Sequence, residues 1–216
     1  MRQFTEQTIL NAVTPVALTS STDATPVVVT ATAHGFVTGD RVYIQGHATN
    51  IAANGIFRVT VLTSSTFSLQ DEFTGLNVAG SGAGAGIATG FCMRAPVVWY
   101  GEDFKTVTFQ IVTTGTSTMN IRTFASDGRL EADSASPRFD FPNMGATISK
   151  TNPYNFLQLI KLDDGATVNG GVGIVVAGTD INNRFEANSN GVKYLTVAPL
   201  TWTQGAITVK AVGYYF

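Results

Sequence analysis

The sequence has few cysteines and few charged residues, and these absences exclude several classes of protein. Its 216 residues include one cysteine, so neither an intrachain disulfide nor a cysteine-rich zinc site can form. Charged residues make up 13% of the chain, which is low for a soluble domain, and the net charge is −2. Nucleic-acid-binding proteins usually carry a basic face, and no Lys/Arg cluster is present. We therefore expect no nucleic acid as a partner.

Long apolar runs are also missing. Hydrophobic residues make up 44% of the chain, yet no run approaches the roughly 18 residues of a membrane span. The first residues, "MRQFTEQTILNAV", combine Arg2 with Glu6 and lack the apolar core and cleavage site of a signal peptide. We expect no membrane partner and no signal peptide. A surface so poor in charge favours a protein that is partly covered by neighbours in an oligomer or a lattice.

The dominant pattern is the alternation of apolar and polar residues that is typical of strands, and no stretch shows a helical period. In "RVYIQ" the alternation places Val42 and Ile44 on one face and Arg41, Tyr43 and Gln45 on the other. Turn signals such as Asn54–Gly55, "TTGTS" and "SDG" follow one another at short intervals, which predicts an all-β sandwich or jelly roll. Further inward-facing residues are expected in three strands: Phe57, Val59 and Val61; Phe67 and Leu69; and Val107, Phe109 and Ile111.

The stretch "AHGFVTGDRVYIQG" contains a histidine and an Asp–Arg pair, which raises the question of a chemical site. Gly35 and Gly39 supply the backbone freedom that turns require, Asp40 can accept hydrogen bonds from turn amides, and His34 can brace the turn through a ring nitrogen. A metal site would need three or four ligands, whereas the chain has only two histidines, His34 and His47, with one carboxylate, Asp40, between them; no G-x-S-x-G motif is present. The stretch is therefore interpreted as a structural turn.

Two resemblances give a more specific expectation. The segment from Pro26 to Leu69, with its HG–GD–V pattern and "TFSL" strand, resembles small β-barrel modules of bacteriophage virion proteins. It also resembles the first catalytic-cysteine half-domain of ubiquitin-activating enzymes. The segments "FKTVTFQIVTTGTSTMNIRTFASDG", "FEANSNGVKYL" and "WTQGAITV", the last expected to be a closing hairpin, resemble jelly-roll structural proteins of tailed phages. The resemblance of the small module implies no catalytic residues, because the corresponding module carries none in phage virion proteins or in ubiquitin-activating enzymes.

These resemblances imply a division of the chain into three parts. Residues 1–19 would form an N-terminal arm and the first strand of the jelly roll, residues 20–90 a small β-barrel module, and residues 91–216 the jelly-roll sandwich. We expect the module to be inserted into a loop of the jelly roll, because "TSSTDATP" and "GSGAGAG" have the composition of exposed loop tips. The alternative is two consecutive domains with a free N-terminal arm.

Candidate chemistry is sparse. Cys92 lies between an aromatic residue and a methionine, which favours a buried structural thiol over a reactive one. Asp163, Asp164 and Asp180 lack the spacing of a calcium loop and are interpreted as turn residues. We therefore expect neither a metal nor a cofactor. Because no set of nucleophile, base and stabilising group is present, we do not expect an enzyme.

The function that these observations favour is a structural protein of a phage virion, most specifically a capsid decoration or cement protein. The expected partners are the major capsid protein, or a tail protein, of the same virion, and further copies of the chain, with a trimer favoured. A second hypothesis is a carbohydrate-binding adhesion module of a phage tail or a cell surface. In that case Trp99 or Trp202 would provide an exposed stacking surface for a sugar.

Overall fold

The computed structural model of the chain describes residues 4–82, 84–85, 90–100, 104–126, 158–169, 174–189 and 194–215. Nearly all regular structure in these ranges is β-strand, and the one helical segment among them is the short 3-10 helix η1 (Ile51–Ala53). The predicted all-β class is confirmed. The described residues divide into two compact units: a small unit of residues 15–95, and a large unit of residues 4–14 together with those from 96 onward.

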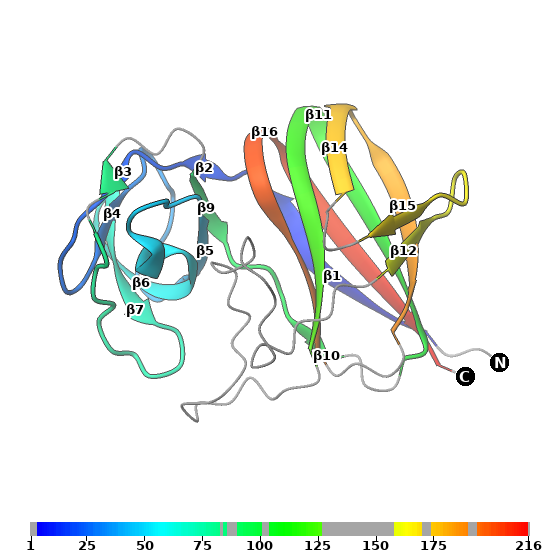
Figure 1. Cartoon of the computed structure of the whole chain (residues 1–216), viewed down its shortest axis with the longest axis horizontal. Helices are drawn as coiled ribbons and strands as arrows, with labels where there is room; N and C mark the ends of the chain where they lie inside the picture. Colours follow the sequence, from blue (N-terminus) through cyan, green and yellow to red (C-terminus); the bar gives the residue numbers. More distant parts are fainter. Residues whose placement is uncertain are drawn as a thin grey trace. The chain divides into compact units, whose positions relative to one another are not determined.

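The small unit contains one antiparallel sheet in the order β2-β9-β5-β6-β7-β4-β3-β8. The segment from Val16 to Ser21 takes part at both ends of this sheet, because β2 pairs with β9 and β3 pairs with β4. The sheet therefore curls round into a small barrel (Figure 1). Its strands are β2 (Val16–Ala17), β3 (Ser20–Ser21), β4 (Val28–Thr30), β5 (Arg41–Gln45), β6 (Gly55–Thr63), β7 (Thr66–Asp71), β8 (Gly84–Ala85) and β9 (Phe91–Arg94).

The alternation in the sequence correctly predicts most of the barrel core. Val42 and Ile44 are fully buried in it, as are the expected apolar residues of β7, and those of β6 are buried or nearly so. Tyr43 is the exception. It was predicted on the outer face with Arg41, but it is completely buried and meets the ring of Phe91 edge-on at 5.9 Å. The outer face of β5 is therefore covered at Tyr43, which alternation alone could not indicate.

The large unit contains the second antiparallel sheet, in the order β1-β16-β11-β15-β12-β13, with β10 paired to β16 and β14 paired to β11. Its core is lined by Val107, Phe109 and Ile111, as predicted, and by Phe185 and Val209 of neighbouring strands. Its strands are β1 (Phe4–Val13), β10 (Trp99–Tyr100), β11 (Thr106–Ser126), β12 (Gln158–Lys161), β13 (Thr167–Asn169), β14 (Ile174–Thr179), β15 (Asn182–Asn188) and β16 (Tyr194–Tyr214).

Two turns that were predicted in this unit are instead bends within long strands. "TTGTS" lies inside β11 and the supposed hairpin "WTQGAITV" lies inside β16, which are both 21 residues long. Their register shifts between Thr114 and Thr118, at the level of Gly205 on the opposite strand. Figure 1 shows both strands bending over at one end of the unit, so that their two halves lie in two layers. The large unit is therefore a β-sandwich whose strands pass from one layer to the other at bulges. The jelly-roll arrangement stays a prediction.

The boundaries between the parts of the chain also differ from those predicted. β1 pairs with β16 of the large unit, whereas β2 and β9 belong to the small unit, so the changes of unit fall after residues 14 and 95 rather than after 19 and 90. Residues 4–8 pair with β16 and do not form a free arm. In sequence, residues 15–95 lie between two segments of the large unit. The "SDG" turn extends past Ser126 and lies outside the described residues.

Candidate functional site

His34 is buried and uses both ring nitrogens to hold the turn that follows it. Its Nδ1 accepts a hydrogen bond from the Phe36 amide at 3.0 Å, and its Nε2 lies 3.1 Å from the Thr63 carbonyl oxygen. A carbonyl oxygen only accepts hydrogen bonds, so the Nε2 atom carries the proton and donates it. The ring also stacks on Phe36 and meets Phe67 edge-on, both at 5.1 Å between centroids. Both ring nitrogens are thus engaged in holding the fold.

The other turn residues complete this arrangement. The Asp40 carboxylate accepts a hydrogen bond from the Val37 amide at 3.1 Å and lies 3.3 Å from the guanidinium of Arg94. Gly35 and Gly39 have φ angles of 67° and 96°, in the left-handed region that side-chain-bearing residues rarely adopt. All four residues of the predicted turn therefore make contacts or adopt backbone angles that shape the loop between β4 and β5.

This loop presents an exposed apolar side chain on a rigid support. Val37 is 60% exposed, and Leu62 of β6 is 53% exposed. The residues next to them in sequence, Thr38 and Val61, are hydrogen bonded: the Thr38 hydroxyl oxygen accepts from the Val61 amide at 2.9 Å. Val37 and Leu62 therefore lie at the same end of the small unit, and we refer to them as the tip pair. A surface that is already ordered loses little conformational freedom when it binds a partner.

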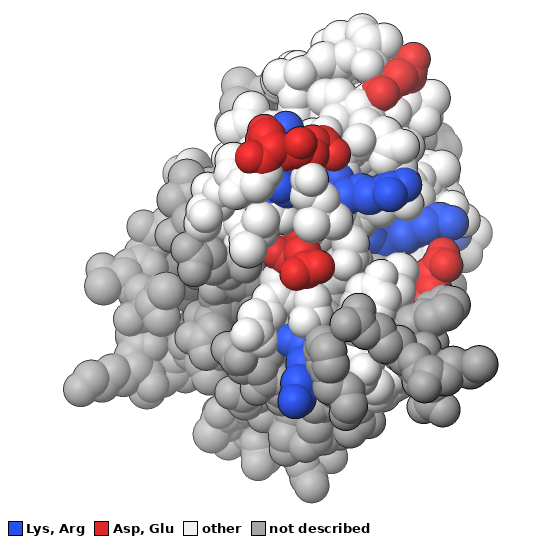
Figure 2. All heavy atoms as spheres, turned by 90° about the vertical axis from the view of Figure 1, so that its right-hand side faces the viewer, with Lys and Arg blue, Asp and Glu red and all other residues white. Residues whose placement is uncertain are grey.

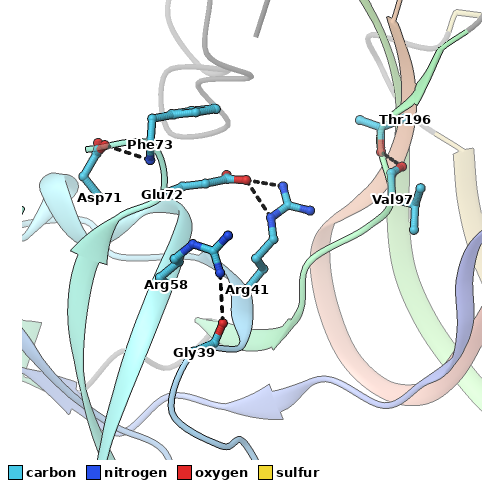
Figure 3. Close-up of polar contacts among 8 residues, drawn as sticks. All are labelled: Gly39, Arg41, Arg58, Asp71, Glu72, Phe73, Val97 and Thr196. Atoms are coloured by element: carbon cyan, nitrogen blue, oxygen red, sulfur yellow. Dashed lines mark hydrogen bonds and ion pairs between the residues drawn. The ribbon is translucent and has the colours of Figure 1, made fainter. Parts of the chain in front are cut away.

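Most charged residues near the tip pair form hydrogen bonds or ion pairs with other residues of the small unit. Arg41 and Arg58 stand directly opposite each other on β5 and β6, an arrangement that is unfavourable for like charges. The Arg41 Nε donates to the Glu72 carboxylate at 2.6 Å, and Arg58 donates to the Gly39 carbonyl oxygen at 3.2 Å (Figure 3). Both guanidinium groups thus have internal acceptors, which leaves the apolar tip pair as the more distinctive feature of this end.

The two tryptophans considered for sugar stacking differ in exposure. Trp99 is buried, at 7% exposure, and packs on Phe104 with 4.6 Å between ring centroids. Its segment is anchored through Val97, whose carbonyl oxygen accepts a hydrogen bond from the Thr196 hydroxyl at 2.8 Å (Figure 3). A sugar platform needs an exposed ring face, so the burial of Trp99 argues against this residue. Trp202 is half-buried, and its Nε1 donates to the Gly205 carbonyl oxygen at 2.9 Å.

A buried polar cluster in the small unit was not anticipated from the sequence. Asn50 donates from Nδ2 to the Ser21 hydroxyl oxygen at 2.9 Å, and that hydroxyl lies 3.3 Å from the Nδ1 of His47. Asn50 also accepts a hydrogen bond from the Ser81 amide at 3.0 Å. Ser21, His47 and Asn50 are all at least nine-tenths buried. The cluster ties three separate segments together, and its burial leaves the Ser–His pair without access to a substrate.

The protonation of His47 is constrained by this environment. The Ser21 hydroxyl, which accepts a hydrogen bond from Asn50, also lies within hydrogen-bond distance of the His47 Nδ1. The Nε2 atom is buried and has no hydrogen-bond partner among the described residues. Burial lowers the pKa of His47 to about 4, because the charged imidazolium would lose its hydration.

Asn54 plays a different part from the one predicted. It was expected to occupy a left-handed turn before Gly55, but its backbone is extended, with φ −89° and ψ 137°. Its side chain instead pairs with the backbone of His47 in both directions: Oδ1 accepts from the His47 amide, and Nδ2 donates to the His47 carbonyl oxygen, each at 2.8 Å. The left-handed residue is Gly55, with φ 138°.

The remaining candidates have structural positions. Cys92 is buried in the barrel core, as predicted, and burial raises the pKa of its thiol to about 12. Asp164 accepts hydrogen bonds from the Ala166 amide and from Lys161, which together lower its pKa, and Asp180 accepts one from the Gly115 amide at 2.8 Å. Both aspartates therefore act in turns of the large unit.

Within the described part of the chain, no three His, Cys, Asp or Glu side chains gather where they could hold a metal ion. No helix in that part is long and apolar enough to cross a membrane. Acidic and basic side chains are intermixed on the face drawn in Figure 2. Ion pairs join some of them, such as Lys210 with Glu6 at 3.4 Å on the large unit.

Comparisons with known proteins place the chain in no family. No protein-family model matches the sequence, and no curated protein matches it. Among solved structures, the crystal structure of the SPBc2 prophage-derived protein YomS is similar over 55% of this chain and 79% of that chain. The sequence identity is 14% and the TM-score is 0.35. A likeness at this level does not identify a shared fold, so a function has to come from the chain's own residues.

Proposed function

We propose that this protein is a structural component of a bacteriophage virion, and most specifically a decoration or cement protein that binds the capsid lattice as an oligomer. The sequence supports this proposal through the resemblance of residues 26–69 to small barrel modules of virion proteins, and of residues 104–214 to structural proteins of tailed phages. The proposal includes no catalytic step and no cofactor. Its partners are the major capsid protein and further copies of the chain.

The observation that carries the proposal is the tip pair. Val37 and Leu62 are exposed on a loop and a strand that hydrogen bonds join directly. The nearby charged side chains are paired with other groups of the small unit. A partner would therefore bind this end through shape complementarity and apolar contact, and not through a charged surface. Single contacts of this kind are weak, but a lattice multiplies them, because each bound copy raises the local concentration for the next contact.

The test is binding to capsids. Virions produced by the phage whose genome encodes this sequence would first be purified and searched for the chain by mass spectrometry. Capsids that lack the chain would then be mixed with the purified protein and sedimented. We expect co-sedimentation at a fixed stoichiometry, weakened by Val37→Asp or Leu62→Asp. Ile160→Asp is the matched control, since Ile160 is an exposed apolar residue of the large unit, at 47%. Absence of the chain from virions would refute the proposal.

Carbohydrate binding by a phage tail or cell-surface module is the alternative function, and Trp202 is the candidate that stays partly exposed. A glycan array separates the two functions. Saturable binding of a defined glycan that Trp202→Ala abolishes, in a protein that ignores capsids, would favour the adhesion module. A blank array together with capsid binding would favour decoration.

A further inference from the structure

The strand β14 forms an edge of the sandwich in the large unit. Its residues pair with one half of β11, from Ile174 opposite Ile121 to Thr179 opposite Thr116. No other described strand pairs with its second side. The backbone amides and carbonyl groups along an edge of this kind are able to form a further ladder with another strand.

The side chains of β14 leave this edge accessible. Val175 is 72% exposed, the largest value among the large hydrophobic residues whose exposure the structure describes, and Ala177, Gly178 and Thr179 are also exposed. Ile174 and Val176 point into the core. The strand "IVVAGT" contains neither a charged residue nor a proline, which are the usual means by which an edge strand avoids pairing.

The other edges among the described strands are short, interrupted or charged, or contain a proline. The half of β16 from Tyr194 to Gln204 pairs with β11 on one side and with only two residues of β10 on the other, and it contains Pro199. β1 is interrupted by two register irregularities and carries the charged pair of Glu6 with Lys210 of β16. β13 has three residues and follows a turn that holds Asp163 and Asp164. β2, β8 and β10 have two residues each. β14 therefore differs from all of them in being uninterrupted, uncharged and free of proline over six residues.

We propose that β14 is the edge through which two copies of this chain pair, antiparallel and about a two-fold axis, into one continuous sheet. When the two-fold axis is perpendicular to the sheet, the same face of both copies points to the same side. Odd-numbered residues of one copy therefore stand opposite odd-numbered residues of the other, and even-numbered residues opposite even-numbered ones. With Ala177 on the axis, Val175 faces Thr179 and Val176 faces Gly178, so each valine meets a smaller residue. No charges oppose each other across this ladder.

A second copy fits this edge better than a different protein. The strand has no charged group with which to select a foreign partner, and an isologous pairing uses the same uncharged strand twice. The net charge of −2 on each chain causes little repulsion between copies. This inference does not depend on the proposed virion function, since it concerns the mass of the free protein, and a two-fold pair differs from the trimer favoured by the sequence.

The test is the mass of the purified full chain in solution, measured by light scattering and sedimentation over a range of concentrations. The wild type should show twice the monomer mass. Ala177→Lys should raise the dissociation constant roughly tenfold or more, because two ammonium groups would face each other at the axis. Ile160→Lys, a matched change at another exposed strand position, should leave the dimer intact, and circular dichroism checks that both variants fold.

A charge swap tests the register. Because Ala177 would face its own copy, Ala177→Lys and Ala177→Glu should each be monomeric alone, and an equimolar mixture should recover the dimer. A wild-type monomer at all concentrations would overturn the proposal, as would an oligomer whose mass Ala177→Lys leaves unchanged. Failure of the mixture to pair would overturn the register with Ala177 on the axis.

Discussion

Ser117 and Gly205 stand opposite each other where β11 and β16 pass from one layer of the large unit to the other, and a Cβ atom on Gly205 would lie 2.9 Å from the Cα of Ser117. The φ angle of Gly205 is 94°, which side-chain-bearing residues rarely adopt. Both strands thus depend on a residue without a side chain at this bend, where the backbone of Ser117 lies close to Gly205.

Gly205→Ala should therefore destabilise the protein by about 3 kcal/mol, since it combines backbone strain with a steric clash. The control is Gly115→Ala in the same bend, where φ is 71° but nothing lies within 4 Å of the added Cβ atom. That change should cost about 1 kcal/mol, from backbone strain alone. Urea denaturation measures both free energies of unfolding, and equal costs would show that the close approach to Ser117 is unimportant.

The buried His47 should make stability depend on pH. Its pKa in the folded protein is about 4, below the ordinary value of 6.5, so the unfolded chain binds the proton more tightly. The stabilisation is therefore fully present above pH 6.5 and is lost as the pH falls towards 4. Between pH 7 and pH 4.5 the contribution of this residue should fall by about 2 kcal/mol.

Urea denaturation at these two pH values, for the wild type and for His47→Gln, isolates this contribution, because the carboxylates titrate in both proteins. The variant should be less stable than the wild type at pH 7 and should lose less stability on acidification. Identical pH dependences in the two proteins would mean that His47 is not the titrating group.

Asn54→Ala should destabilise the small unit by about 2 kcal/mol or more, because the amide and carbonyl groups of His47 would both lose their partner in a buried setting. Hydrogen exchange should show faster exchange of the His47 amide in the variant. Asn77→Ala, in an exposed position after β7, is the control and should change stability little. An Asn54 variant as stable as this control would contradict the bidentate pairing.

Glu72→Gln should leave Arg41 beside Arg58 without its carboxylate partner and should cost about 1 kcal/mol at low salt, with a smaller cost at high salt. Glu6→Gln removes an ion pair between two half-exposed side chains and is the matched control, with an expected cost near zero. Thermal unfolding at two salt concentrations measures the difference. A cost for Glu72→Gln that salt does not change would indicate a packing effect.

The sequence predicts those features that depend on near neighbours in the chain. Alternation in β6, β7 and β11 correctly identifies the core residues, because opposite faces of a strand follow directly from residue order. Cys92 is buried as its apolar neighbours indicate. The same rule fails at Tyr43, because burial of the outer face depends on Phe91, which is distant in sequence.

Features that depend on distant residues could not be predicted. The polar cluster joins Ser21, Asn50 and Ser81, and no spacing in the sequence links these three. Gly115 and Gly205 resemble turn glycines in sequence, yet they lie within continuous strands because each strand has a partner along both of its halves. The tip pair likewise combines residues of two segments that are distant in sequence and are joined by hydrogen bonds such as the one between Thr38 and Val61.

The pairing of β1 with β16 has a consequence for synthesis on the ribosome. Among the described strands β1 is synthesised first and its partner β16 last, and residues 15–95 of the small unit are synthesised between them. The barrel of the small unit can therefore fold while β1 is still unpaired. The sandwich of the large unit can form only after β16 has left the ribosome. Pairings between segments so far apart form slowly, so β1 has to be protected from aggregation until its partner strand is available.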